Sequence, residues 1–404
     1  MTSIIDKPLA TRESALEQLD AFKPKLGHAY AADRNFDNGP HEHLSVSTLS
    51  PWVRHRLILE EELVSAALGS HSFAASEKFI QEVFWRSYWK GWLEMRPQVW
   101  RDYELSRDQD LADWEGKSEL QEAFTGNTGI ACFDFWVREL VETNYLHNHA
   151  RMWFASIWIF TLRLPWTLGA DFFMQHLLDG DPASNTLSWR WVGGLQTRGK
   201  TYLARADNIC KFTRGRFNPA GQLAMDAQPL DGPMAPAPKT LSFQNPVNPD
   251  TPYVLIVTED DLGLESLDIS PKSLRQIIYV NCSEKRSPNG ISPRVAGFIS
   301  NAMSTAIKFA NEMDIPVSKC DPGDVNGIIN TVSASGVKQV ITPFAPVGPA
   351  QDVLGVVEDR AIENNISFTR LARSYDRETW PYATKGFFKF KEAIPSLIAR
   401  LGIG

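Results

Sequence analysis

One short segment of the chain carries charged and aromatic side chains at the spacing of a single helical stripe. At positions i, i+3, i+4 and i+7 of that stripe stand Glu82, Trp85, Arg86 and Trp89. A buried charge is costly unless it pairs with another group or contacts a polar ligand. The stripe therefore predicts either a paired patch of helical core, which is the commoner meaning of an aromatic stripe, or one wall of a binding site.

Two later segments show a similar mixture of residue types. In residues 145–152, Asn148 and Met152 share one helical face, and His147 and Arg151 share the adjoining one. The next segment combines two carboxylates, an amide and two indoles: Asp179, Asp181, Asn185, Trp189 and Trp191. Such a density of polar and aromatic groups favours the wall of a binding site over a core segment.

In this order, the three segments resemble the FAD-binding domain of DNA photolyases and cryptochromes, and the resemblance covers residues 27–219. Tyr30 resembles the family's tyrosine at the flavin phosphates, and Arg34 resembles its DNA-facing arginine. Residues 47–52 resemble a hydroxyl-rich helix start that holds the FAD pyrophosphate, since anions bind at helix N-termini. The sequence departs from the family at Val46, where another hydroxyl is usual.

The resemblance implies FAD as the cofactor and assigns a set of residues to it. These residues are Tyr30, Ser47, Thr48, Leu49, Ser50, Arg86, Arg151, Asp179, Asp181 and Asn185. Arg151 and Asp179 resemble a salt-bridged pair beside the isoalloxazine, and Asp181 would accept a hydrogen bond from the ring or the ribose. Asn185 matches the residue that faces flavin N5. Asparagine there, as in photolyases, can accept a hydrogen bond from protonated N5 and so favours reduced or radical flavin.

The resemblance also implies a tryptophan relay that carries an electron from the surface to the flavin. Trp189 and Trp166 match positions at which the family has electron-transfer tryptophans, and Trp114 is a third match. With Glu82 and Asn185, these three indoles make up the catalytic set that we expect.

A pocket for a flipped-out pyrimidine dimer is implied as well. Glu82 would hydrogen-bond the dimer, and Trp85 and Trp191 would stack on its bases. Stacking contributes about 1–3 kcal/mol per base, which offsets the cost of extracting the dimer from the duplex. The other members of the expected DNA-binding set are Arg34, Asn148 and Met152. His149 departs from the pattern, since dimer photolyases usually have arginine at its position.

These assignments predict a light-driven DNA photolyase that splits cyclobutane pyrimidine dimers in single- or double-stranded DNA with electrons from photoexcited reduced FAD. The alternative is a cryptochrome-like blue-light photoreceptor that uses the same flavin and relay to signal to a partner. His149, the net charge of −7 and the order of the domains support that alternative. The cation-rich segment 198–216 would lie on DNA phosphates or else form a solvated loop.

The elements that must position these residues are mainly helical. Apolar residues recur at helical spacing in 57–68, 77–93, 130–143 and 150–164. Twelve of the thirteen tryptophans precede residue 192, and eight prolines fall between Pro219 and Pro252, a density that interrupts helices and strands. The sequence therefore predicts three regions: a helical photolyase-type FAD-binding domain at 1–219, a linker at 220–250 and a further domain at 251–404.

The region after the linker alternates short apolar strands with helices, which predicts a Rossmann-like parallel α/β domain. The expected strands are 253–258, 276–281, 315–319, 338–343 and 366–371, and the expected helices include 295–313 and 350–364. No G-x-G-x-x-G motif or P-loop marks a nucleotide site in it. The family's α/β antenna domain usually precedes the flavin domain. We therefore interpret this region as a relocated antenna-type domain, with any second chromophore unknown, or as an unrelated α/β module.

Composition and spacing exclude several other classes of protein. The four cysteines form no C-x-x-C pair, so we expect neither a metal site nor a disulfide scaffold. The histidine pairs His41/His43 and His147/His149 are spaced i, i+2, which is more typical of surface or hydrogen-bonding residues than of metal ligands. The longest apolar run, 152–162, is shorter than the ~20 residues of a membrane span, and the chain opens without an apolar leader. We therefore expect a cytoplasmic protein without membrane contact.

Overall fold

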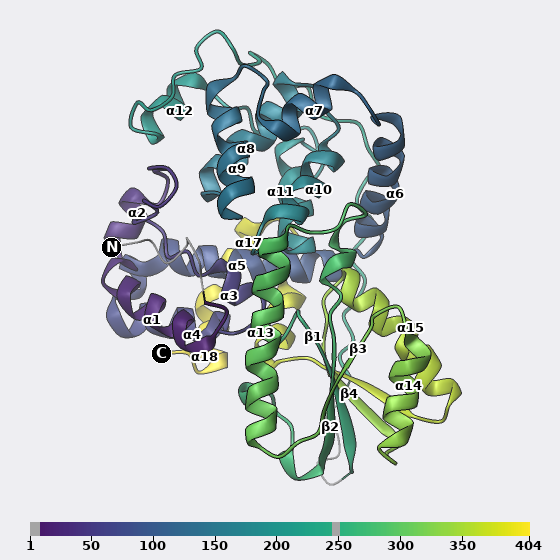
Figure 1. The fold of residues 1–404 in the computed structure, drawn as a ribbon. Helices are drawn as coiled ribbons and strands as arrows, with labels where there is room; N and C mark the ends of the chain where they lie inside the picture. Colours follow the sequence, from purple (N-terminus) through teal and green to yellow (C-terminus); the bar gives the residue numbers. More distant parts are fainter. Residues whose placement is uncertain (1–8, 245–250) are drawn as a thin grey trace.

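The computed structural model describes residues 9–244 and 251–404, which form a helical part and a sheet-containing part (Figure 1). The helical part contains α1 (Arg12–Phe22), η2 (Lys23–Lys25), α2 (His28–Asp33), α3 (Ser50–Arg54), α4 (Glu60–Ser70), α5 (Phe73–Glu94), α6 (Gln98–Asp113), α7 (Ser118–Thr125), α8 (Ala131–Thr143), α9 (Asn148–Ser156), the π-helical turn η3 (Ile157–Thr161), α10 (Trp166–His176), α11 (Pro182–Val192) and α12 (Ala206–Phe212). The four helices expected from apolar spacing in this part are confirmed.

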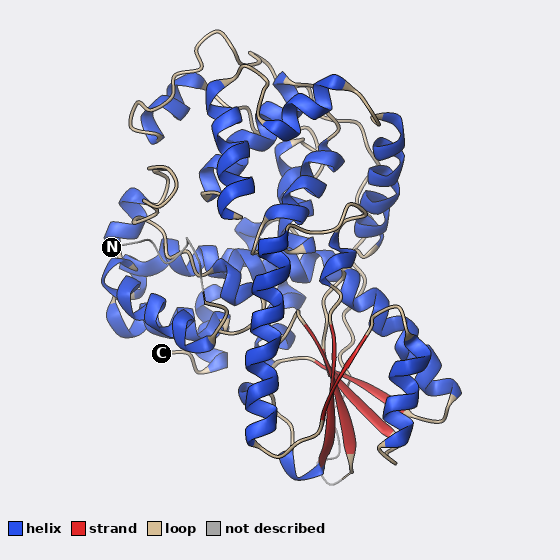
Figure 2. Ribbon diagram, viewed as in Figure 1, coloured by secondary structure: helices blue, strands red, loops and turns tan. Residues whose placement is uncertain are grey.

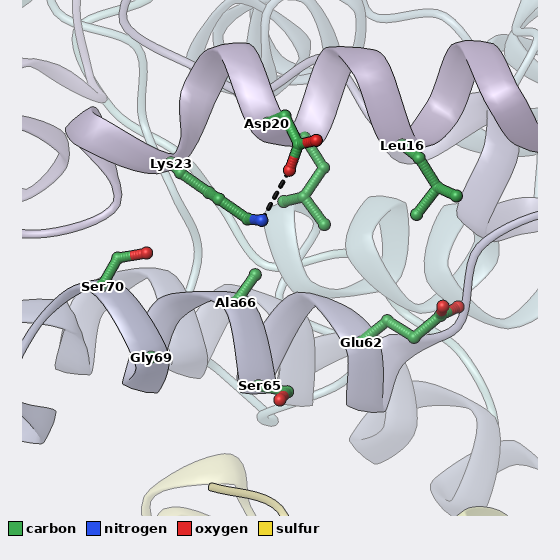
Figure 3. Close-up of a pocket in the computed structure, with 9 residues that line it drawn as sticks. Leu16, Asp20, Lys23, Glu62, Ser65, Ala66, Gly69 and Ser70 are labelled. Atoms are coloured by element: carbon green, nitrogen blue, oxygen red, sulfur yellow. Dashed lines mark ion pairs between the residues drawn. The ribbon is translucent and has the colours of Figure 1, made fainter.

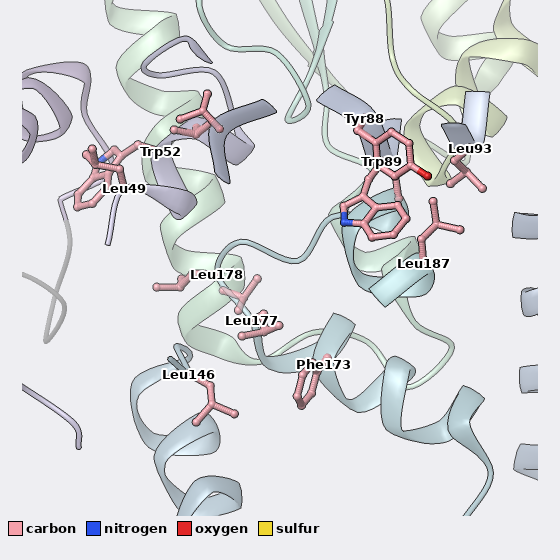
Figure 4. Packing of buried hydrophobic residues seen from close by; sticks show 14 of the residues in the cluster. Leu49, Trp52, Tyr88, Trp89, Leu93, Leu146, Phe173, Leu177, Leu178 and Leu187 are labelled. Atoms are coloured by element: carbon pink, nitrogen blue, oxygen red, sulfur yellow. The ribbon is translucent and has the colours of Figure 1, made fainter. Parts of the chain in front are cut away.

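Side-chain caps define where α1 and the 22-residue α5 begin. Thr11 accepts the backbone N–H of Ser14 at the start of α1, and Ser72 accepts that of Ala75 at the start of α5. The core lies where α3, α5, α9, α10 and α11 converge, and Figure 4 shows Leu146, Leu177 and Leu178 packed there. These helices hold the three segments singled out in the sequence against one another.

Residues 220–244, within the expected linker, contain no helix or strand and follow the surface of the helical part. The backbone N–H of Leu230 donates to the Gly193 carbonyl at 2.9 Å, and that of Lys239 donates to the Met95 carbonyl at 3.0 Å. Residues 245–250 of the expected linker lie outside the described residues.

The sheet-containing part is built on five parallel strands in the order β3-β2-β1-β4-β5. The strands are β1 (Tyr253–Thr258), β2 (Leu274–Val280), β3 (Val317–Cys320), β4 (Gln339–Pro343) and β5 (Ser367–Leu371). α13 (Pro293–Glu312) covers one face, while α14 (Val325–Ala334) and α15 (Pro349–Glu363) cover the other (Figures 1 and 2). The short turns of this part are η4 (Leu264–Ser266), η5 (Pro271–Ser273) and η6 (Ser283–Arg286). The predicted fold class and all five predicted strands are confirmed.

After β5 the chain returns to the helical part (Figure 1). This C-terminal segment contains α16 (Ser374–Thr379), η7 (Trp380–Tyr382), α17 (Phe387–Lys391) and α18 (Ile394–Leu401), and the first three contact α5. The approach is close, because a Cβ at Gly91 of α5 would lie 2.7 Å from the Cα of Trp380. Among the described residues, no helix is long and apolar enough to cross a membrane.

Candidate functional site

The hydroxyl-rich segment 47–50 forms the turn that leads into α3. Thr48 has a left-handed backbone, with φ of 56°. The Gln18 side-chain amide holds this turn by donating to Thr48 Oγ1 at 3.1 Å and to the Ser47 carbonyl at 2.9 Å. Leu49 is buried, and Ser50 begins α3.

Arg151 and Asp179 form the ion pair that the sequence suggested. Arg151 Nη2 lies 3.0 Å from Asp179 Oδ2, although α9 and the turn before α11 are far apart in the chain. Burial acts to raise the pKa of Asp179, but Arg151 and the Ser50 hydroxyl outweigh burial and lower this pKa. The pair therefore stays charged beside the turn that leads into α3.

Asp181 stands at the start of α11, where it accepts the Ser184 backbone N–H at 2.8 Å. Its carboxylate lies 3.9 Å from Arg54 Nε and 3.9 Å from Lys90 Nζ. Burial acts to raise the pKa of Asp181, whereas Lys90 and Arg54 lower it well below the usual range for a carboxyl. Asp181 is therefore an anion held between two buried cations.

Several buried polar groups at this place have no hydrogen-bond partner within the described part of the chain. They are Nε and Nη2 of Arg86, Oδ1 of Asp179 and Oγ of Ser184. Arg86 Nε lies 3.8 Å from Glu60 Oε1, which is beyond hydrogen-bonding distance. Since buried polar groups are nearly always paired, these atoms fit a polar ligand such as the dinucleotide FAD.

Asn185 has its amide fixed by the backbone of α10. Nδ2 donates to the Ala170 carbonyl at 2.8 Å, so Oδ1 is the atom that remains to accept a hydrogen bond. The side chain is 8% exposed. The expected role of Asn185 beside flavin N5 calls for such a free acceptor.

The three expected relay tryptophans lie in different surroundings. Trp189 is buried against Phe173, with ring centroids 5.2 Å apart, and against Trp158 at 6.3 Å. Trp166, at the start of α10, lies 5.6 Å from Tyr103, and Trp114 is covered by the Lys117 ammonium at 4.2 Å. The structure thus gives Trp189 a neighbouring indole, Trp158, that the sequence interpretation did not include.

The expected DNA-binding residues are only partly assembled. Arg34 forms an ion pair with Glu82, next to the buried Tyr30. Trp191 is stacked on Tyr202 at 5.5 Å. On α9, Asn148 is exposed and Met152 is half-buried.

One face of the Trp85 ring, which was expected to be open for base stacking, is covered by another aromatic ring. The ring of Phe387, from the C-terminal segment, is stacked on it with centroids 3.6 Å apart and an interplanar angle of 10°. Trp89 packs at 5.1 Å. The sequence did not predict this contact, because it depends on the return of the chain to α5.

A surface hollow of about 440 Å³ lies elsewhere, between α1 and α4 (Figure 3). Its lining includes the Asp20–Lys23 ion pair, and none of the expected site residues lines it. It therefore does not belong to the candidate cofactor site.

Comparison with known proteins relates part of the chain to a known family. Residues 79–225 match the family model described as the FAD binding domain of DNA photolyase. This part of the chain is similar to the FAD-binding domain of the DNA photolyase and cryptochrome family. A deoxyribodipyrimidine photo-lyase of Streptomyces griseus is 32% identical over 41% of this chain and 38% of that protein, and one of Synechococcus is 32% identical over 44% and 37%. The chain thus spans less than half the length of these relatives. A class III photolyase structure from Agrobacterium tumefaciens has a TM-score of 0.42 at 24% identity, covering 50% of this chain and 42% of the other.

The sheet-containing part contacts the helical part through charges that the sequence interpretation missed. Arg54 Nε donates to the Gly180 carbonyl at 2.8 Å, and Arg54 Nη2 lies 2.7 Å from Asp260. Arg286, fully buried, faces the same turn, and a Cβ at Gly180 would lie 3.4 Å from its Nη1. Arg54 is the last residue of α3, the short helix that the hydroxyl-rich segment begins, which was an available signal. Nothing local in the sequence signals Asp260 or Arg286.

Proposed function

We propose that this chain is a light-driven photolyase that splits cyclobutane pyrimidine dimers in DNA. The observation that carries the proposal is the placement of Glu82 and Arg86 on one face of α5. Nε and Nη2 of Arg86 are buried without a hydrogen-bond partner among the described residues, whereas the Glu82 side chain is 32% exposed. One helix thus connects a cofactor-facing cation to a surface carboxylate, as dimer repair beside a flavin requires.

FAD, when bound, would supply the electron that splits the dimer after absorbing light. The protein would supply position and charge. Arg86 and the Arg151–Asp179 pair would hold the cofactor, and the Asn185 carboxamide oxygen would accept a hydrogen bond from a protonated ring nitrogen. Glu82 would accept a hydrogen bond from the dimer, beside its ion-pair partner Arg34. Trp189 would pass an electron inward from the protein.

Glu82→Gln tests the repair proposal. A charge-assisted hydrogen bond contributes about 1.5–3 kcal/mol, so dimer-containing DNA should bind at least about tenfold more weakly. Undamaged DNA should bind no more weakly, because Arg34 would lose its anionic partner. The measurements are titrations with both DNAs and the yield of split dimers per absorbed photon, with Glu77→Gln on the same helix as the control. Unchanged affinity and yield in Glu82→Gln would remove Glu82 from the site.

A blue-light photoreceptor is the second candidate function. The stacking of Phe387 on Trp85 favours it, since this ring occupies one face that a flipped base would use. A photoreceptor needs no base pocket, and a C-terminal segment packed at the flavin domain could transmit a light-induced change. Reduced protein that photoreduces flavin normally, yet leaves dimers intact under blue light, would establish this candidate over repair.

Phe387→Leu should separate the two candidates further. Leucine keeps an apolar group in the contact but frees the ring face of Trp85. Base stacking contributes about 1–3 kcal/mol, so a repair enzyme should bind dimer-containing DNA at least about fivefold more tightly. Phe388→Ala is the matched control, because the Phe388 side chain next to it is 83% exposed. If the affinities of both variants equal that of the unaltered protein, Trp85 is not a stacking platform.

A further inference from the structure

A second group of buried polar side chains lies away from the candidate flavin site. Asp37, in the loop after α2, His43, in the loop before α3, and Glu139, on α8, each offer a ligand atom, and these atoms all lie within 4.8 Å of one another. The three residues are 0%, 7% and 3% exposed. Charged groups so deeply buried must be paired or must bind an ion.

Several ligand atoms of this group have no hydrogen-bond partner among the described residues. Both carboxylate oxygens of Glu139 and Nδ1 of His43 lack a hydrogen-bond partner. His43 Nε2 lies 3.4 Å from Glu139 Oε1, which is longer than the usual N–H···O hydrogen bond. Two ligands at about 2.0–2.1 Å from a tetrahedral zinc ion lie roughly 3.3 Å apart. The observed separation therefore suits two ligands of one metal ion better than a hydrogen bond.

Asp37 is already oriented toward the group. Its Oδ2 accepts from Trp136 Nε1 at 3.1 Å and lies 3.0 Å from Arg216 Nη2, while Oδ1 accepts the Gly39 backbone N–H at 3.0 Å. Such outer contacts hold metal-binding carboxylates in place. Arg216 balances one of the two carboxylates, so the charge of Glu139 is left for a cation.

His147 packs against the group without being a ligand itself. Its ring is parallel to that of His43, with centroids 6.1 Å apart. His147 Nδ1 accepts the His149 backbone N–H at 3.2 Å, so a neutral His147 carries its proton on Nε2 and cannot offer that atom to a metal. This Nε2 is buried without a partner, and it could donate to a water molecule in a fourth coordination position.

We propose that Asp37, His43 and Glu139 bind one divalent metal ion, for which zinc is the best fit. One imidazole and two carboxylates are ligands that zinc accepts, and the spacing suits four-coordination with water as the fourth ligand. The ion would tie the segment between α2 and α3 to α8. That segment carries Arg34 and the turn at residues 47–50, so the metal would have a structural role. The proposal does not depend on the activity of the flavin site.

The test uses the full chain, stripped with a chelator and dialysed against Zn²⁺ or Co²⁺. We expect one equivalent of metal per chain and, with Co²⁺, the intense visible absorption bands of a tetrahedral site. Bound Zn²⁺ should raise the midpoint of thermal unfolding, because a ligand that binds only the folded state stabilises it.

Glu139→Gln and His43→Gln should each weaken Zn²⁺ binding at least 100-fold and abolish the thermal shift, since each removes a direct ligand, a loss larger than the roughly 10–100-fold cost of an outer-shell change. Glu142→Gln, an exposed change on the same helix, is the control and should behave as the unaltered protein. If one of the two glutamine variants misfolds, the other still tests the proposed site. Absence of stoichiometric binding, or equal affinity in Glu139→Gln and Glu142→Gln, would overturn the proposal.

Discussion

Arg56→Ala is expected to lower the free energy of unfolding by about 3–5 kcal/mol, the range found when one partner of a buried ion pair is removed. Arg56 is 3% exposed and lies between the two parts of the molecule. Its Nη1 is 3.1 Å from Asp261, and its Nη2 is 2.5 Å from Asp376. The substitution would leave two buried carboxylates with a partner missing from each.

Arg360→Ala provides the contrast for this measurement. Arg360 pairs with Glu363 at 2.9 Å on α15, but both side chains are largely exposed. An exposed pair contributes about 0–1 kcal/mol, so this variant should unfold almost as the unaltered protein does. Denaturant unfolding of both variants gives the comparison, and similar small losses would show that Arg56 does not join the two parts.

The pH dependence of unfolding tests the same contact of Arg56 with Asp261 and Asp376. Burial acts to raise the pKa of Asp261, but Arg373 and Arg56 lower it to about 2. The pKa of Asp376 is raised instead, because Arg56 only partly offsets the effect of burial and the nearby Glu60 adds to that effect. An unfolded aspartate has a pKa of about 3.9. The stabilisation from Asp261 is therefore complete above about pH 4 and is lost as the pH falls toward 2. The free energy of unfolding of Arg56→Ala should fall less over that range than that of the unaltered protein.

The parts of the structure that local pattern determines could be predicted from the sequence. Strands β1 and β4 are buried along their whole length, and the edge strands β3 and β5 are only partly buried, yet each strand is a short segment that local sequence marks. The Arg151–Asp179 pair was predicted as well, because a family resemblance links segments that composition cannot connect. Phe387 on Trp85 could not be predicted, because it depends on how the end of the chain returns to α5.

The buried charges between the two parts were missed for a related reason. Arg54 and Asp260 are separated by about half of the chain, and neither segment by itself indicates its distant partner. The histidine pair His41/His43 was interpreted as hydrogen-bonding or surface residues by spacing alone. The structure places His43 beside Glu139 of α8, a neighbour that no i, i+2 pattern reveals.

Arg86→Met should weaken FAD binding about tenfold to a hundredfold, the loss that follows when one charge-assisted contact of about 1.5–3 kcal/mol is removed. Nε and Nη2 of Arg86 are buried without hydrogen-bond partners in the described part of the chain, so their partner is to be sought in the ligand. Methionine fills similar space without charge. The measurement is titration of cofactor-free protein with FAD, followed by flavin fluorescence, with the exposed Arg101→Met on α6 as the control.

The stability of the cofactor-free variant distinguishes a ligand contact from a structural one. An unpaired buried guanidinium costs free energy, so its removal should leave the midpoint of thermal unfolding unchanged or raise it. Glu60 would keep its attraction to Arg56 and Lys90, which also lower its pKa against the effect of burial. If Arg86 instead serves the fold through Glu60, Arg86→Met should unfold at a lower temperature without cofactor. Weaker FAD binding together with undiminished stability therefore assigns Arg86 to the cofactor.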